Sequence, residues 1–341
     1  MSGILSAIGL LFGKLMYFIY VTVGFHNYAL SIVLFTIVYK LILLPLSMKQ
    51  IKSSQKMQEI QPELSRIQER YKNDKEKLNE ATMKLYQEKG YNPASGCLPM
   101  LIQLPILLAL FYVIRMPMSY MLDIPAKAVG EMAVVAIQKG EFSYGNVGEE
   151  AFNKIKDDPT EVYKAFSQKD PYFEVKLMSV IDKNQELIHN NPYLDDSRKA
   201  VLSEFKMKML SIFNFGTPPT LDFKAITSDP ATNIPPLILL LLAVLTTYFT
   251  AVLTMPAPPK DTKDKNAANA GCASKSMLWI SPIMTLWIGL TTPSGLSFYW
   301  TINNILSFAQ QKALNKIYKK DVKEQKEEII VGKVNNKRSK K

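Results

Sequence analysis

A lysine lies inside an apolar stretch of this sequence. Lys40 falls in residues 28–47 (YALSIVLFTIVYKLILLPLS), about seven residues before their polar end, which is roughly 10 Å along a helix. An ammonium group at the centre of a bilayer costs about 2.5–3.5 kcal/mol, so such a side chain normally faces protein or water. Its four-carbon stem can also carry the charge part of the way to the membrane surface. We predict a water-filled interior site for Lys40, with this snorkelling as the alternative.

Polar residues at helical spacing accompany this lysine on its own stretch and on other apolar stretches. Each stripe alone has a plain explanation, because Ser and Thr bond to their own helix backbone and Asn and Gln join neighbouring helices. Stripes on three helices beside one buried cation are better explained by a shared hydrated groove. The predicted groove residues are Thr36, Lys40, Ser47, Gln103, Thr246, Thr250, Trp300 and Asn303.

The apolar stretches contain no Asp or Glu. A proton relay or an ion-coupled transporter usually has such an intramembrane carboxylate. A cation in such a hydrated groove instead invites an anionic visitor.

Other kinds of chemistry find no support in the sequence. Two Cys and two His residues argue against a disulfide scaffold and against a Cys/His metal cluster. Neither a P-loop nor a dinucleotide-binding glycine motif occurs. We therefore expect no enzymatic activity, no metal and no cofactor.

Five apolar stretches are long enough to cross a bilayer, which takes about 20 residues per helix. The mean hydropathy of +0.00 is an average of these stretches and of strongly charged segments. The predicted fold class is an all-α polytopic membrane protein, with a five-helix transmembrane core and a cytoplasmic helical hairpin. The predicted spans are 28–47, 98–116, 234–255, 277–292 and 294–311, the last two joined by the turn TTPSG.

The charge of the connecting segments predicts the orientation. The chain has a net charge of +11, and the segments 48–97, 256–276 and 312–341 are positive, whereas 117–233 is acidic. Five spans place all three positive segments on one side, which the positive-inside rule assigns to the cytoplasm. We expect a multi-pass protein of the cell membrane, with residues 117–233, here called the insert, outside the cell.

The two longest polar segments have helical periodicity. In 48–97, Ile60, Leu64 and Ile67 form an apolar stripe, which predicts a helical hairpin, and Pro62 is expected at the start of a helix rather than inside one. In the insert, the spacing of Val201, Phe205, Met209 and Ile212 predicts one amphipathic helix. The insert is otherwise expected to be a helical lid or spacer without chemistry of its own.

Four stretches resemble a known family. They are FTIVYKLILLPLSMKQIKSSQKMQEIQPELSRIQERYKND, MKLYQEKGYNPASGCLPMLIQLPILLALFYVI, FGTPPTLDF and PSGLSFYWTINNILSFAQQ. In this order they resemble the YidC/Oxa-type membrane protein insertases, in the form found in single-membrane bacteria, and the match extends over about 25–117 and 212–312.

The resemblance implies an insertase and membrane chaperone. Members of the family have a hydrophilic groove that opens to the cytoplasm and to lipid, with a positive residue at the position of Lys40. Hydrophilic segments of nascent membrane proteins enter the groove while their apolar spans move into lipid, without covalent chemistry. The alternative is a small-anion transporter that uses Lys40 as its binding charge.

The resemblance also implies partners. The hairpin would receive nascent chains, and the general secretion channel would be a further partner. The basic tail would contact ribosomal RNA phosphates or anionic membrane lipids. The tail residues for this contact are Lys319, Lys320, Lys337, Arg338, Lys340 and Lys341.

This sequence departs from the family pattern at several places. The groove cation of the family is usually Arg, and Lys keeps the charge but lacks the forked donor set. Thr250 stands where the family often has Gln, and the insert is longer than usual. The stretch 3–24, within the segment 1–27, takes the place of the family's interfacial amphipathic helix, which favours an interfacial position over a span.

Overall fold

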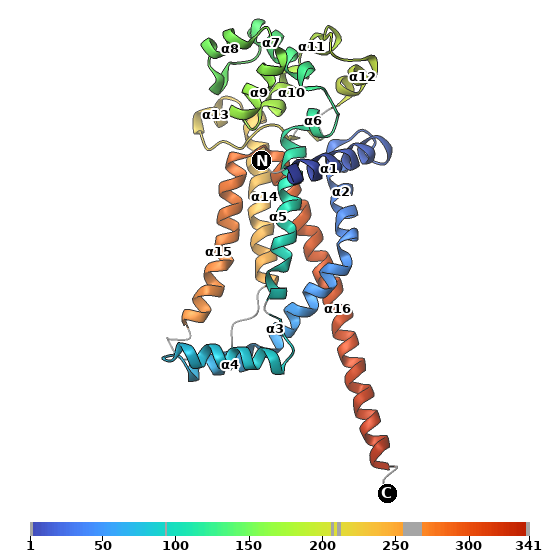
Figure 1. Ribbon diagram of the computed structural model, residues 1–341, viewed down its shortest axis with the longest axis vertical. Helices are drawn as coiled ribbons and strands as arrows, with labels where there is room; N and C mark the ends of the chain where they lie inside the picture. Colours follow the sequence, from blue (N-terminus) through green and yellow to red (C-terminus); the bar gives the residue numbers. More distant parts are fainter. Residues whose placement is uncertain (1–2, 93, 206–207, 210–212, 255–267, 339–341) are drawn as a thin grey trace. The chain divides into compact units, whose positions relative to one another are not determined.

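The computed structural model describes residues 3–92, 94–205, 208–209, 213–254 and 268–338 (Figure 1). Its side chains are described over 6–92, 105–205, 213–253 and 278–317. The chain divides into two compact units. The first unit comprises Met1–Tyr39, Ile102–Thr247 and Pro282–Ile302, and the second comprises Lys40–Leu101, Tyr248–Ser281 and Asn303–Lys341.

The described chain is mostly helical, as predicted for an all-α protein. Its strands are two residues each, β1 (Lys208–Met209) and β2 (Phe213–Asn214), which pair antiparallel. The long helices are α1 (Gly3–Thr22), α2 (Tyr28–Ile42), α3 (Leu44–Arg70), α5 (Ala94–Arg115), α14 (Pro230–Thr254), α15 (Ala268–Thr291) and α16 (Ser294–Arg338).

Several of these helices are apolar. Within the described residues, the segment Pro230–Leu253 of α14 is by itself long and apolar enough to cross a membrane, and α2 and α3 pass the same test together. Shorter apolar helices cover Ser6–Thr22, Pro105–Arg115 and Leu278–Thr291. The predicted set of five spans therefore stays a prediction.

In the second unit, α3 is followed by the shorter helix α4 (Lys75–Glu88), which begins at an Asp74 cap that accepts the amide of Lys77 at 3.1 Å. The expectation that Pro62 starts a helix was wrong, because α3 runs through it. Pro62 is exposed, so water can bond to the backbone carbonyl that proline leaves without its helical donor.

The short helices of the first unit form the insert, and Figure 1 shows most of them gathered in one cluster. They are α6 (Pro117–Tyr120), α7 (Ala126–Gln138), η1 (Gly145–Val147), α8 (Glu149–Ile155), α9 (Pro159–Lys169), α10 (Phe173–Ile181), α11 (Glu186–His189), α12 (Asp196–Glu204) and α13 (Phe223–Ser228). The rings of Phe152, Phe166 and Phe173 are buried and in contact. The insert therefore has a hydrophobic core of its own.

A close backbone approach fixes α7 against α9. A Cβ atom added to Gly130 would lie 1.8 Å from the carbonyl oxygen of Pro159. Glycine is required here because any side chain would push the two helices apart.

The prediction of an amphipathic helix over Val201–Ile212 was wrong. Helix α12 ends at Glu204, and Phe205 has an extended backbone. Its ring packs against Tyr20 of α1 and Tyr28 of α2. Phe205 lies at a helical spacing from Val201, but it is apolar because it belongs to the core of the first unit and not because the helix continues.

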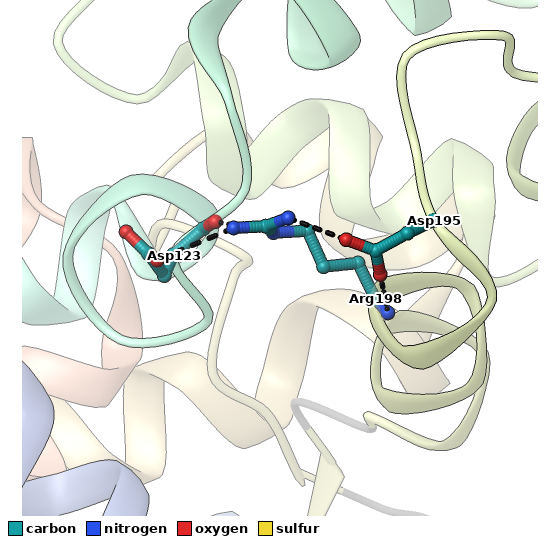
Figure 2. Close-up of polar contacts among 3 residues, drawn as sticks. All are labelled: Asp123, Asp195 and Arg198. Atoms are coloured by element: carbon teal, nitrogen blue, oxygen red, sulfur yellow. Dashed lines mark hydrogen bonds and ion pairs between the residues drawn. The ribbon is translucent and has the colours of Figure 1, made fainter.

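Arg198, Asp195 and Asp123 form polar contacts that join α12 to the loop after α6 (Figure 2). Arg198 Nε donates to the Asp123 carbonyl at 3.0 Å, and Arg198 NH1 donates to Asp195 Oδ2 at 2.5 Å. Asp123 has a positive φ of 52°, an uncommon conformation for a residue with a side chain. The arginine therefore holds a strained turn in place.

Candidate functional site

Lys40 lies in the last turn of α2, and its ammonium group contacts α16. Lys40 Nζ donates to Ser307 Oγ at 2.7 Å, while Ser307 Oγ donates to the carbonyl of Asn303 at 2.6 Å. The hydroxyl of Ser307 thus donates its hydrogen bond to its own helix and accepts one from the ammonium of Lys40. This hydrogen bond directs the ammonium of Lys40 toward α16.

A second polar contact of the second unit joins α3 to the same helix, α16. Gln55 Nε2 on α3 donates to Asn315 Oδ1 on α16 at 2.6 Å. Together with the contact of Lys40 and Ser307, it makes a polar seam along this part of α16. Sequence reasoning did not select Gln55 and Asn315, because both look like ordinary surface residues of charged helices.

In the first unit, the predicted groove residue Thr36 is fully buried and donates to the carbonyl of Ile32 at 2.6 Å. Its neighbour Tyr39 is hydrogen-bonded through its hydroxyl to Tyr299 at 3.0 Å. This pair of tyrosines joins α2 to α16 and was not predicted, since neither ring stands out in an apolar sequence.

Two neighbouring threonine hydroxyl groups of α14 are bonded within the helix. Thr246 Oγ1 donates to the Leu242 carbonyl at 2.8 Å, and Thr247 Oγ1 donates to the Ala243 carbonyl at the same distance. Thr247 is buried and accepts a bond from Thr285 of α15 at 3.4 Å. Sequence reasoning selected Thr246 for its stripe and missed its buried neighbour.

The structure distributes the predicted groove residues over the two units. Among those described, it brings Lys40 and Asn303 together through Ser307. The second unit contains Lys40, Ser47, Thr250 and Asn303, and the first contains Thr36, Gln103, Thr246 and Trp300.

Some predicted residues lie outside the described part of the chain. Gln103 lies in α5, but its side chain is outside the described residues. The same holds for the side chains of Lys319, Lys320, Lys337 and Arg338 in α16, and for Lys340 and Lys341 altogether.

Sequence reasoning also did not select a buried carboxylate in the insert. Glu174 of α10 is 1% exposed and accepts the Ser119 amide at 3.1 Å, the Ser119 hydroxyl, and the Tyr163 hydroxyl at 3.1 Å. Burial raises the pKa of Glu174 to about 7, because the desolvation of the charged form outweighs these hydrogen bonds. The local signal is one acid at the start of a mostly apolar helix.

The sequence that forms these helices places the chain in a known family of membrane proteins. The chain belongs to the family described as 60Kd inner membrane protein, whose model matches residues 18–323. Individual relatives are named membrane protein insertase YidC. The chain is 58% identical over 87 residues to the one from Clostridium perfringens and 55% identical over 89 residues to the one from Fusobacterium nucleatum.

The stretches aligned with these relatives are short compared with the proteins. Each covers 26% of this chain, with 37% of the Clostridium perfringens protein and 43% of the Fusobacterium nucleatum protein. The chain thus spans less than half the length of the relatives it matches.

Proposed function

We propose that this chain is a membrane protein insertase and membrane chaperone. Hydrophilic segments of nascent membrane proteins enter a hydrated groove that carries the charge of Lys40, while their apolar spans partition into lipid. The observation that carries the proposal is the ammonium of Lys40, held by the neutral hydroxyl of Ser307 at the end of an apolar helix. Membership of the family, and relatives named as insertases, support it.

The chemistry of this contact suits a transient anionic guest. An ammonium has three donors and no acceptor, and the hydroxyl of Ser307 that it contacts is a neutral group. An incoming carboxylate is attracted more strongly here than in bulk water, because the surroundings have a lower dielectric constant.

The driving force for insertion comes from the substrate. Each large apolar side chain that leaves water contributes about 1.5–3 kcal/mol, and a membrane potential of about 100 mV adds roughly 2.3 kcal/mol for each charge moved. The groove needs only to lower the barrier for the polar segment. No covalent step is required, and the protein does not act as an enzyme in this proposal.

The remaining segments have supporting roles in the proposal. The hairpin of α3 and α4 faces the cytoplasm and receives nascent chains, and the basic end of α16 contacts the ribosome or anionic lipids. The insert lies outside the cell, α1 lies in the membrane interface, and the general secretion channel is a further candidate partner. The charge distribution of the connecting segments supports this orientation.

The decisive experiment measures insertion in cells depleted of their own insertase, with a substrate that has an acidic translocated tail. We expect Lys40→Glu to abolish its insertion, because the groove then repels the tail, and Lys40→Arg to retain it. The matched control is Lys49→Glu, which makes the same charge change at an exposed position of α3.

Crosslinking completes the test. A photoreactive residue at Asn303 should crosslink to a ribosome-held nascent membrane protein, and the crosslink should be lost in Lys40→Glu. Full insertion activity of Lys40→Glu would refute the proposed groove mechanism. Uptake of a labelled small anion into proteoliposomes without any nascent chain would support the transporter alternative instead.

A further inference from the structure

Two exposed apolar side chains distinguish the end of the insert that leads into α14. Among the described residues of the insert, three large apolar side chains are more than one-third exposed: Tyr193 (37%), Leu221 (70%) and Phe223 (76%). Tyr193 is accounted for, because the ammonium of Lys127 lies 4.3 Å from the centre of its ring. Leu221 and Phe223 are two residues apart and form the exposed apolar surface that remains.

This apolar pair is held in a fixed place. Asp222 caps α13 by accepting the amide of Lys224 at 2.9 Å. Asn233, in the first turns of α14, donates through Nδ2 to the carbonyls of Ala225 at 2.9 Å and Asp229 at 3.0 Å. Helix α13 is therefore tied to the beginning of α14, to which a single residue connects it (Figure 1).

The surface that begins at α13 continues along α14. Ile234, Ile238 and Leu241 of α14 are exposed. Among the helices that the structure describes, α14 is apolar and long enough by itself to span a membrane. A helix tied to its first turns must lie where α14 enters the bilayer, at the level at which interfacial helices bury Leu and Phe side chains.

A contact within the chain does not explain the pair. Leu221 precedes the cap residue Asp222, and Ile226 is the fourth residue of α13, so a hydrophobic staple would join Leu221 to Ile226. Such a staple would bury Leu221, whose exposure is 70%.

We propose that α13 is an interfacial anchor, whose Leu221 and Phe223 side chains insert into the headgroup and acyl boundary of the bilayer next to the start of α14. Lys224 is exposed and can reach lipid phosphates, but Asp222 and Asp229 flank it. Attraction to anionic lipid is therefore small, and burial of the two apolar side chains dominates. The occupant is the lipid bilayer itself, and the anchor does not depend on the proposed insertase activity.

The experiment uses the full chain with Cys97→Ser and Cys272→Ser, reconstituted into phosphatidylcholine vesicles with brominated acyl chains. An environment-sensitive fluorophore is attached at Thr227→Cys, one turn from Phe223 on the same face of α13, where the hydroxyl bonds only within its helix. The matched control is Ser197→Cys, which is exposed on α12 in the same insert.

We expect bromine to quench the label at residue 227 at least about twofold more than the label at residue 197. Leu221→Ser combined with Phe223→Ser should lower the population at the interface by at least about tenfold, and addition of anionic phosphatidylglycerol should change little. Hydrogen exchange of α7 to α10 verifies that the double variant is folded, and Phe223→Ser alone replaces it if that core has changed.

Equal quenching at the two positions would overturn the proposal, as would quenching that persists in the serine variants. A label at residue 227 that is shielded from water but not quenched by bromine would also overturn it. That result would assign the surface to a protein partner or to a second copy of this chain.

Discussion

Replacement of Glu174 by glutamine tests how the insert responds to pH. The carboxyl group joins α10 to Ser119 of α6 and to Tyr163 of α9, and it is almost fully buried. Glutamine has nearly the same shape and can still accept the hydrogen bonds of the Ser119 and Tyr163 hydroxyls through its carbonyl oxygen. It loses the bond from the Ser119 amide to the second carboxylate oxygen, and it cannot ionise. The variant therefore removes the titration and keeps most of the packing.

The sign and the size of the effect follow from the pKa of Glu174. The pKa rises from 4.5 to about 7 on folding, so the folded state binds more protons between these two values. The contribution of protonated Glu174 to the free energy of unfolding is fully present below pH 4.5 and is lost as the pH rises through about 7. The difference between the two pKa values corresponds to about 3 kcal/mol.

The assay is hydrogen exchange of the full chain in lipid nanodiscs between pH 5 and pH 8, corrected for the intrinsic exchange rate of each peptide. In the wild type, the free energy of opening of α6, α9 and α10 should fall by about 2.5 kcal/mol between pH 5 and pH 8. In Glu174→Gln it should be flat. The control is Glu161→Gln, which removes an exposed carboxylate of α9 and should leave the wild-type slope unchanged.

Two results would refute this reasoning. The first is a wild-type opening free energy that does not change over this range of pH. The second is a Glu174→Gln variant that keeps the wild-type slope, because the titrating group would then be another residue.

Three further substitutions test the packing. Gly130→Ala should destabilise the insert by about 1–3 kcal/mol, because the new methyl group meets the Pro159 carbonyl; an unchanged thermal unfolding midpoint would contradict this close contact. Arg198→Gln should cost about 1 kcal/mol and increase hydrogen exchange around Asp123, whose carbonyl it releases; unchanged exchange there would show that the turn holds itself. Glu63→Gln breaks an exposed ion pair between α3 and the end of α4 and should change the free energy of unfolding by less than about 1 kcal/mol, as measured by denaturant titration.

Much of the helical character could be predicted from the sequence, because long apolar runs and periodic stripes are local signals. The interior of α3 could not, since Pro62 argues for a break and only its exposed position lets water replace the lost bond. The course of the chain after Glu204 could not either, because Phe205 has helical spacing but is a partner of Tyr20 and Tyr28.

The candidate site also has one part that could be predicted from the sequence and one part that could not. Lys40 could be selected because one charge within an apolar stretch is conspicuous in any hydropathy reading. Its partner Ser307 and the polar contact of Gln55 with Asn315 depend on which helix faces which, and more than 250 residues separate the members of each pair along the chain.

By itself, the sequence determined the helical class, the family resemblance and the unusual position of Lys40, since these are properties of single segments. Only the tertiary structure decided that the ammonium of Lys40 meets a hydroxyl, that Glu174 is buried and that Leu221 and Phe223 are not. Burial and pairing are set by the surfaces that other segments bring to a residue. No local pattern of apolar and polar residues contains that information.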